Sequence, residues 1–435
     1  PALAWFVMGY GFIAAILPVW MLLAPRDYLS TFLKLGTVVL LAIAIFVMRP
    51  DLKMPALTRF IDGTGPIFSG KLFPFVFITI ACGAISGFHS LISSGTTPKL
   101  MRTEADVRLV GYGSMMLESF VAIMAMIAAT LLDPGVYFAI NSPLAALGGS
   151  PDVAVATLTS WGFPVTTGQM QALANEVGEA TLFARTGGAP SLAVGMASIF
   201  SSVFGARLLA IWYHFAIMFE AVFILTTLDA GTRVGRFMVQ DALGQFWEPL
   251  GRTSWYPSVI LASAIVVSGW GYFLYVGVID PYGGINILWP LFGIANQMLA
   301  GIALAIATAI FLKTGRARFC WVTGLPLAWL AVVTSTAAYQ KLFSLDPKIG
   351  FLASASDLAE KLAAGALAME KAAVAGKLMI NLRIDAALTA FFLLVLWVVI
   401  LDMLRIGWRA YRGGPLTSAV EAPYQRTQYA GVANA

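Results

Sequence analysis

The chain has 435 residues, of which 59% are hydrophobic and 11% are charged, and its formal net charge is +5. Soluble domains carry about 25% charged residues, so a soluble protein of this composition would expose large apolar patches. The composition therefore excludes an ordinary soluble domain and indicates a protein embedded in a lipid bilayer. The small positive charge is typical of basic cytoplasmic loops, and we expect no nucleic-acid partner.

Apolar stretches long enough to cross a bilayer recur along most of the chain, because one span needs about 20 such residues. We predict spans at residues 3–24, 31–49, 72–94, 109–132, 207–229, 255–279, 286–312, 319–340 and 385–405. A shorter apolar segment, 189–204, is predicted to be re-entrant or interfacial. The predicted fold class is therefore an all-α polytopic membrane protein with nine or ten transmembrane helices, some of them discontinuous.

These spans divide the chain into membrane regions and two insertions. The membrane regions are residues 1–132, 189–340 and 384–435, the last ending in a basic cytoplasmic tail with Arg405, Arg409 and Arg412. Residues 133–188 form an acid-leaning insertion, and residues 341–383 form an Ala-rich one. Both insertions show apolar residues at helical spacing, so we expect amphipathic helices on the membrane surface, with partner docking as the alternative.

The third span is rich in glycine and in small polar residues. Glycines permit local unwinding of a helix, and hydroxyls satisfy the backbone groups that unwinding frees. Secondary transporters use such interruptions to present backbone groups to substrates and ions. We therefore predict a broken helix whose substrate-binding residues are Gly83, Ser86, Gly87, His89 and Ser90. A Gly-xxx-Gly packing face between two helices remains the alternative.

Ionisable residues also occur inside the apolar spans. A carboxylate in lipid costs at least ~2.5 kcal/mol on insertion scales, so each such group must pair, protonate or face water. Histidine titrates near physiological pH. We predict proton coupling at Glu118 and His89, with a satisfied packing histidine as the alternative for His89. For His214 and Glu220 we expect structural pairing.

The span at 286–312 is predicted to be a second broken helix, because it contains Pro290 and Gly293. Asn296 and Gln297 follow, and their amides can bind a carboxylate or a peptide group. We therefore predict both as substrate-binding residues. Hydrogen bonding between helices is the alternative.

Asp229 and Arg233 follow the fifth predicted span, within a predicted loop at residues 229–252. Their spacing of four residues allows an ion pair on a helical turn. We predict a cytoplasmic gate there, and a solvated loop with basic residues is the alternative.

Several functional classes lack their sequence signatures. The chain has no Gly-xxxx-Gly-Lys-Ser/Thr phosphate loop, no His-Glu-xx-His motif and only two cysteines, Cys82 and Cys320, in apolar stretches. An ATP-driven pump and an intramembrane metalloprotease are therefore unsupported. We expect no enzyme, no metal site and no cofactor.

Three stretches resemble the carbon starvation protein A family of bacterial inner-membrane carriers. They are residues 80–90 continuing through 93–99, residues 224–233, and residues 288–297. The resemblance implies uptake of peptides, or of pyruvate in close relatives, during carbon starvation. It also implies coupling to an ion gradient, with protons as the expected ion, and a fold similar to the amino acid–polyamine carriers with inverted repeats.

Members of that family carry an additional amino-terminal membrane region with a helix break of its own. We therefore expect this sequence to lack the amino-terminal part of the carrier, which would be its partner in forming the substrate site. A channel or a nutrient-sensing membrane receptor, in which binding signals without transport, is the alternative of another class.

Overall fold

The computed structural model describes residues 2–279, 285–367 and 369–414, and in these ranges every regular element is a helix. The longer helices are α1 (Ala2–Ile16), α2 (Leu23–Met48), α6 (Asp106–Thr130), α11 (Ala189–Phe204), α12 (Leu209–Gly244), α13 (Tyr256–Ile279), α14 (Ile285–Lys313), α15 (Cys320–Phe343), α16 (Phe351–Ala363) and α17 (Met369–Tyr411). The shorter α-helices are α3 (Leu72–Ile80), α4 (Gly87–Gly95), α5 (Thr97–Leu100), α7 (Pro134–Asn141), α8 (Leu144–Leu147), α9 (Pro151–Ser160) and α10 (Thr167–Val177). Single 3₁₀ turns are η1 (Arg59–Asp62), η2 (Ala81–Gly83), η3 (Ala206–Leu208), η4 (Glu248–Gly251) and η5 (Ala317–Phe319).

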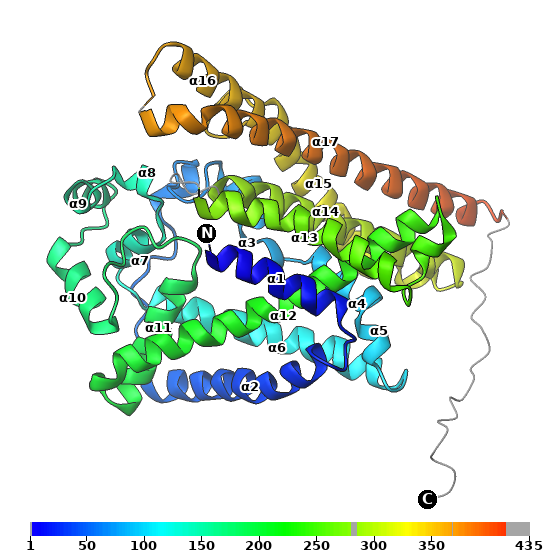
Figure 1. Ribbon diagram of the computed structural model, residues 1–435, viewed down its shortest axis with the longest axis horizontal. Helices are drawn as coiled ribbons and strands as arrows, with labels where there is room; N and C mark the ends of the chain where they lie inside the picture. Colours follow the sequence, from blue (N-terminus) through cyan, green and yellow to red (C-terminus); the bar gives the residue numbers. More distant parts are fainter. Residues whose placement is uncertain (1, 280–284, 368, 415–435) are drawn as a thin grey trace, which may run out of the picture.

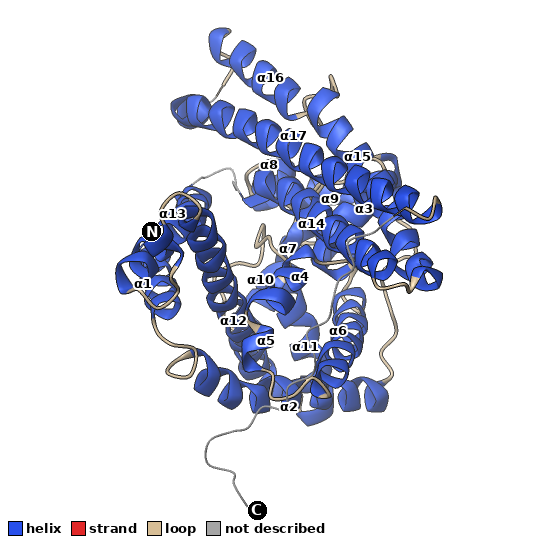
Figure 2. Cartoon of the chain, turned by 90° about the vertical axis from the view of Figure 1, so that its right-hand side faces the viewer, coloured by secondary structure: helices blue, strands red, loops and turns tan. Residues whose placement is uncertain are grey.

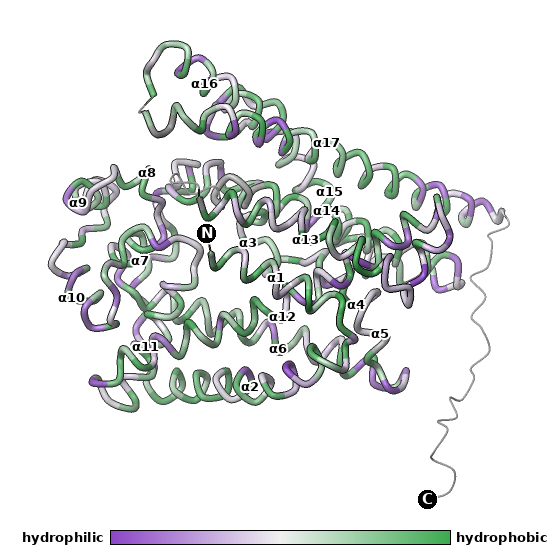
Figure 3. The backbone as a smooth tube through the Cα atoms, viewed as in Figure 1, coloured by the Kyte–Doolittle hydropathy of each residue, from purple (hydrophilic) through white to green (hydrophobic). Residues whose placement is uncertain are grey.

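Eight helical segments of the described chain are long and apolar enough to cross a membrane, counting α3 and α4 as one, and two shorter apolar helices, α1 and α11, accompany them. Hydrophobic colour runs along α2, α6 and α12 in Figure 3, whereas hydrophilic colour gathers toward their ends and over α9 and α10. The predicted class, an all-α polytopic membrane protein, is confirmed.

The helices form two packed groups, and Figure 2 shows α2, α6 and α12 apart from α15 and α17. In the first group, α2, α6, α11 and α12 share an apolar core with α7, α9 and α10. In the second, α3, α14, α15 and α17 share another core. The short helix α4 contacts both α12 and α14, so the interrupted segment lies where the two groups meet.

Two of the predicted boundaries are wrong. The stretch 3–24 is not one span, because α1 ends at Ile16 and α2 begins at Leu23. Pro18 and Pro25 explain the division, since proline interrupts a helix interior and is tolerated in a first turn. The predicted loop at 229–252 is helical as far as Gly244, so Asp229 and Arg233 lie inside α12.

The two insertions differ in how they join the membrane helices. Residues 133–188 fold into α7–α10, which gather at one end of the molecule in Figure 1 and contribute to the first core. Residues 341–383 form α16 and the beginning of α17, which pack against each other. The boundary expected at residues 383–384 therefore falls inside the continuous helix α17.

Candidate functional site

The segment that joins α3 to α4 is an interrupted helix, as predicted. α3 ends at Ile80, a single 3₁₀ turn follows, and α4 begins only at Gly87. Ala81 has φ of 49°, a backbone conformation that residues with a side chain rarely adopt. Ser86 caps the new helix, because its Oγ accepts a hydrogen bond from the His89 backbone N–H at 3.3 Å. The chain therefore leaves the helix and restarts it within six residues.

Two neighbouring amides of α14 bind backbone groups on either side of this interruption. Asn296 Oδ1 accepts a hydrogen bond from the Phe88 backbone N–H at 2.9 Å. Gln297 Nε2 donates to the Phe77 carbonyl oxygen at 2.7 Å and to that of Ala81 at 3.4 Å. Both side chains are buried. Because a buried unpaired backbone group costs several kcal/mol in apolar surroundings, these amides stabilise the break.

Glycines let the interrupted helix approach α14 closely. A Cβ atom at Gly87 would lie 2.2 Å from the Asn296 carbonyl oxygen, and one at Gly293 would lie 2.4 Å from the Ile78 carbonyl oxygen. Both distances are shorter than any real contact. Gly87 therefore serves close packing between two helices, which was the alternative for the third span, as well as the unwinding of the helix. For Gly83, the nearest atom is Ile80 Cγ2 at 3.2 Å.

The break predicted in the 286–312 span is absent, because α14 is continuous from Ile285 to Lys313. Pro290 is the sixth residue of this helix, so its missing N–H removes one backbone hydrogen bond, but the helix continues through it. Gly293 serves the close approach to α3. One broken helix therefore packs along one continuous helix.

The two residues predicted for proton coupling lie side by side, although they belong to different helices. His89 Nε2 in α4 is 3.4 Å from Glu118 Oε2 in α6. Their side chains are 56% and 52% exposed within the protein, so the pair is reachable from outside the packed core. A protonated imidazole and an ionised carboxylate attract each other at this distance. Ser90 Oγ donates to the Gly87 carbonyl oxygen at 2.6 Å and shapes the first turn of α4.

The interrupted segment also packs on α12, the helix that carries the predicted gate. A Cβ atom at Gly231 would lie 3.0 Å from Phe88 Cε2, and one at Gly95 would lie 2.9 Å from Val234 Cγ2. Gly231 stands between Asp229 and Arg233 in the sequence. The two other segments predicted to be functional, in α12 and α14, therefore both pack against α4.

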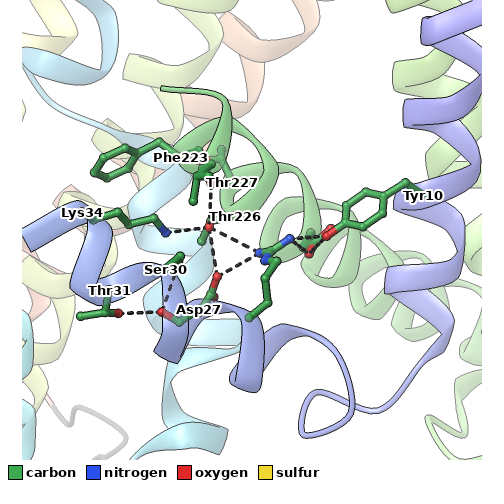
Figure 4. Close-up of polar contacts among 11 residues, drawn as sticks. Tyr10, Asp27, Ser30, Thr31, Lys34, Phe223, Thr226 and Thr227 are labelled. Carbon is green, nitrogen blue, oxygen red and sulfur yellow. Dashed lines mark hydrogen bonds and ion pairs between the residues drawn. The ribbon is translucent and has the colours of Figure 1, made fainter. Parts of the chain in front are cut away.

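Asp229 pairs with Arg26, and not with Arg233. Its Oδ2 accepts hydrogen bonds from Arg26 Nη1 at 2.5 Å and from the Tyr10 hydroxyl at 3.0 Å. Arg26 also donates to Asp27 Oδ1 at 2.9 Å. Figure 4 shows polar side chains from α1, α2 and α12 turned toward one another, with Tyr10 on one side and Asp27 on the other. We call Tyr10, Arg26, Asp27 and Asp229 the charge cluster.

Arg233 and its neighbour Arg236 bind the carboxyl-terminal end of α1. Arg233 donates to the carbonyl oxygens of Leu17 at 2.8 Å and of Ala14 at 2.5 Å, and Arg236 donates to that of Ala15 at 2.7 Å. The last carbonyls of a helix lack partners within it and carry partial negative charge. Both arginines are buried, so they fasten α1 to α12.

Sequence reasoning missed Tyr10 and Arg26 as partners of Asp229. The available signal was Pro18 and Pro25, which indicate that the first apolar stretch is divided and that Arg26 opens a new helix. The partners themselves are about 200 residues distant in sequence, beyond the reach of helical periodicity.

A cavity of about 620 Å³ opens along α12 beside these contacts. It is lined mostly by apolar side chains, among them Val121, Leu192, Phe219 and Trp270, and by Glu220. Among the described residues Glu220 makes no ion pair, so the structural pairing expected for it is not present. The cavity has the size of pockets that hold small organic ligands.

We expect Asn296→Leu to destabilise the protein by about 1–3 kcal/mol, because the buried Phe88 N–H loses its acceptor. Unfolding of the purified protein in detergent, followed by thermal or denaturant titration, measures this effect. The control is Asn175→Leu, which alters an exposed amide of α10. Equal effects of both changes would contradict the role assigned to Asn296.

The arrangement is that of a polytopic membrane protein in which one broken helix docks between continuous spans. The sequence profile of the family described as carbon starvation protein CstA matches residues 1–337. The chain therefore belongs to the CstA carbon starvation protein family, as its resemblance indicated.

Individual relatives agree with this assignment. The chain is 54% identical over 430 residues to "Peptide transporter CstA" of Escherichia coli (strain K12), with 97% of this chain and 61% of the relative covered. It is 48% identical over 450 residues to "Pyruvate/proton symporter BtsT" of the same organism, covering 98% and 63%. A "Peptide transporter CstA" of Mycobacterium tuberculosis (strain ATCC 25618 / H37Rv) is 46% identical over 439 residues, covering 98% and 58%.

The chain spans roughly three fifths of the length of these curated relatives. No solved structure matches it. The expected likeness to amino acid–polyamine carriers, with inverted repeats, therefore stays a prediction, and so does the additional amino-terminal region.

Proposed function

We propose that this protein is a secondary active transporter that takes up peptides across the inner membrane of a bacterium during carbon starvation, coupled to protons. The interrupted helix α3–α4, held by amides of α14 and flanked by the His89–Glu118 pair, is the observation that carries the proposal. Similarity to relatives named as peptide transporters supports the cargo. This makes the protein a carrier and not an enzyme.

Substrate would bind at the break, because unwound backbone offers hydrogen-bonding groups in the middle of a membrane helix. Its binding residues would be Gly83, Ser86, Gly87, His89 and Ser90. Asn296 and Gln297 would contribute chiefly by shaping the break, since their amides already bond its backbone or the side chains beside it. The neighbouring cavity of about 620 Å³ would admit a short peptide and exceeds the needs of a three-carbon acid.

Coupling would use the His89–Glu118 pair. Proton binding to His89 strengthens its attraction to the Glu118 carboxylate, and proton loss weakens it. Because His89 belongs to the broken helix and Glu118 to α6, protonation would alter the position of α4. Alternating access around α4 would follow, with Asp229 and Arg233 on α12 controlling the end of α1 as a gate.

Pyruvate is the second candidate cargo, because one relative named as a pyruvate/proton symporter is 48% identical over nearly the whole chain. The amino-terminal end of α4, where the helix dipole is positive, would attract the carboxylate of pyruvate. Competition between a dipeptide and pyruvate for labelled uptake separates the two cargoes.

Gradient-driven uptake by the full-length protein in proteoliposomes tests the proposal. We expect peptide accumulation when a pH gradient is imposed, and no accumulation when every ion gradient is collapsed. In Glu118→Gln, accumulation should fall to the level seen without a gradient while substrate exchange persists, because exchange needs no net proton movement. The control, Glu104→Gln, removes an exposed carboxylate just before α6 and should leave both rates unchanged.

Three outcomes would contradict the proposal. Accumulation that survives collapse of all gradients would exclude symport. A ligand that binds without ever accumulating would favour a channel or a nutrient-sensing receptor. Loss of folding in Glu118→Gln would mark Glu118 as a structural residue.

A further inference from the structure

A buried carboxyl group in α17 has no partner. Asp385 is fully buried, and neither of its carboxyl oxygens makes a hydrogen bond with any described residue. It lies inside the membrane-spanning segment Ala372–Tyr411. An ionised carboxylate in such surroundings needs an ion partner or several hydrogen-bond donors, whereas a neutral carboxylic acid costs far less to bury. The surroundings of Asp385 therefore favour the protonated form of its carboxyl group.

Thr389, one helical turn further on, is equally buried, and its hydroxyl is also without a partner. This is unusual for a threonine in a helix, because the hydroxyl ordinarily donates a hydrogen bond to the carbonyl oxygen four residues earlier. Thr308 and Thr334 do so, at 2.8 and 2.6 Å. The carboxyl group of Asp385 and the hydroxyl of Thr389 are four residues apart, so these two groups without hydrogen bonds lie on the same helix face.

No charged residue of the described chain forms an ion pair with Asp385. The helices packed against α17 are α14, α15 and α16. Their titratable groups are Lys313 at the end of α14, Cys320, Tyr339 and Lys341 in α15, and Asp357, Glu360 and Lys361 in α16. Asp357 and Lys361 pair with each other at 2.7 Å.

Lys341 is the one buried cation among these neighbours, and aromatic rings surround it. Its Nζ lies 5.3 Å from the ring centres of Phe68 and Phe75 and 5.5 Å from that of Phe351. Aromatic faces attract a cation at such distances. No ion pair joins Lys341 and Asp385 within the described chain.

We propose that Asp385 and Thr389 form an intramembrane proton-binding site of the transport cycle. A proton from the water on one side forms the O–H bond of the Asp385 acid. That bond breaks when water from the other side reaches the carboxyl group, and the Thr389 hydroxyl then donates to the carboxylate. This site lies in the second helix group and is additional to the His89–Glu118 pair. It rests on the proposed function, because it names a carrier of the coupling ion.

Transport by Asp385→Asn in the full-length protein tests the role in coupling. Asparagine imitates the neutral acid but cannot release a proton. We expect accumulation driven by a pH gradient to fall to the level without a gradient, while peptide exchange is retained. Asp402→Asn, an exposed carboxylate further along α17, is the matched control and should accumulate normally. Normal accumulation in Asp385→Asn would overturn the proposal.

Infrared spectroscopy of the protein in lipid tests proton binding without any transport. We expect a carbonyl band of a protonated acid that is missing in Asp385→Asn and shifts in Asp385→Glu. The band should disappear at high pH in the wild type. Absence of a band assigned to Asp385 would overturn the proposal. If the band is present but no cargo accumulates, the proposed transport function fails and the proton site stands.

Discussion

Asp229→Asn is expected to destabilise the protein by about 1–3 kcal/mol, because Arg26 loses its buried partner and keeps only the half-buried Asp27, at 2.9 Å. The Asp229 side chain is fully buried and also accepts a hydrogen bond from Tyr10. Arg233 and Arg236 lie one and two turns further along α12, so removal of the carboxylate leaves a local excess of positive charge. Denaturant titration of the purified protein in detergent measures the loss.

The matched control is Asp241→Asn, which removes an exposed carboxylate from the same helix. Its effect should be within about 0.5 kcal/mol of zero. Arg26→Met combined with Asp229→Asn should recover part of the stability, because the guanidinium that has lost its buried partner is then removed as well. A double variant no more stable than Asp229→Asn alone would contradict the ion pair as the cause.

Gly87→Ala is expected to cost about 1–3 kcal/mol and to lower transport, because the added methyl group would overlap the Asn296 carbonyl oxygen at 2.2 Å. The backbone of α14 cannot yield as a flexible side chain would, so α4 must move away from it. That movement would lengthen the hydrogen bond between the Phe88 N–H and Asn296. Thermal unfolding and uptake in proteoliposomes measure the two effects.

Gly269→Ala is the control for this change. Gly269 lies in α13, and a Cβ atom there has no neighbour within 4 Å. Alanine should be neutral or slightly stabilising at that position, because it is the better helix former. If Gly87→Ala were as harmless as Gly269→Ala, the close contact between α4 and α14 would not hold in the membrane.

The interrupted third span was predictable from sequence because its cause is local. Gly83, Ser86 and Gly87 stand within five residues of one another, and each favours leaving the helix or restarting it. The break predicted around Pro290 was wrong for an equally physical reason. Pro290 removes only one backbone hydrogen bond of α14, and the nearby Gly293 serves contact with α3.

The burial of Asp385 could not be predicted from the residues next to it in the sequence. The predicted last span begins at this residue, directly after the predicted insertion at 341–383. In the structure α17 already begins at Met369, and α14, α15 and α16 cover its face. Burial of one side chain thus depends on helices that lie up to 100 residues away in sequence.

The sequence by itself determined the all-α membrane class and the family, because apolar length and contiguous motifs are properties of neighbouring residues. It also singled out His89 and Glu118, since ionisable groups in apolar helices are conspicuous. Only the tertiary structure decided that these two side chains meet at 3.4 Å, and that Asp229 pairs with Arg26. Such pairings follow from which helix faces pack together, and packing depends on shape complementarity along the whole chain, not on local spacing.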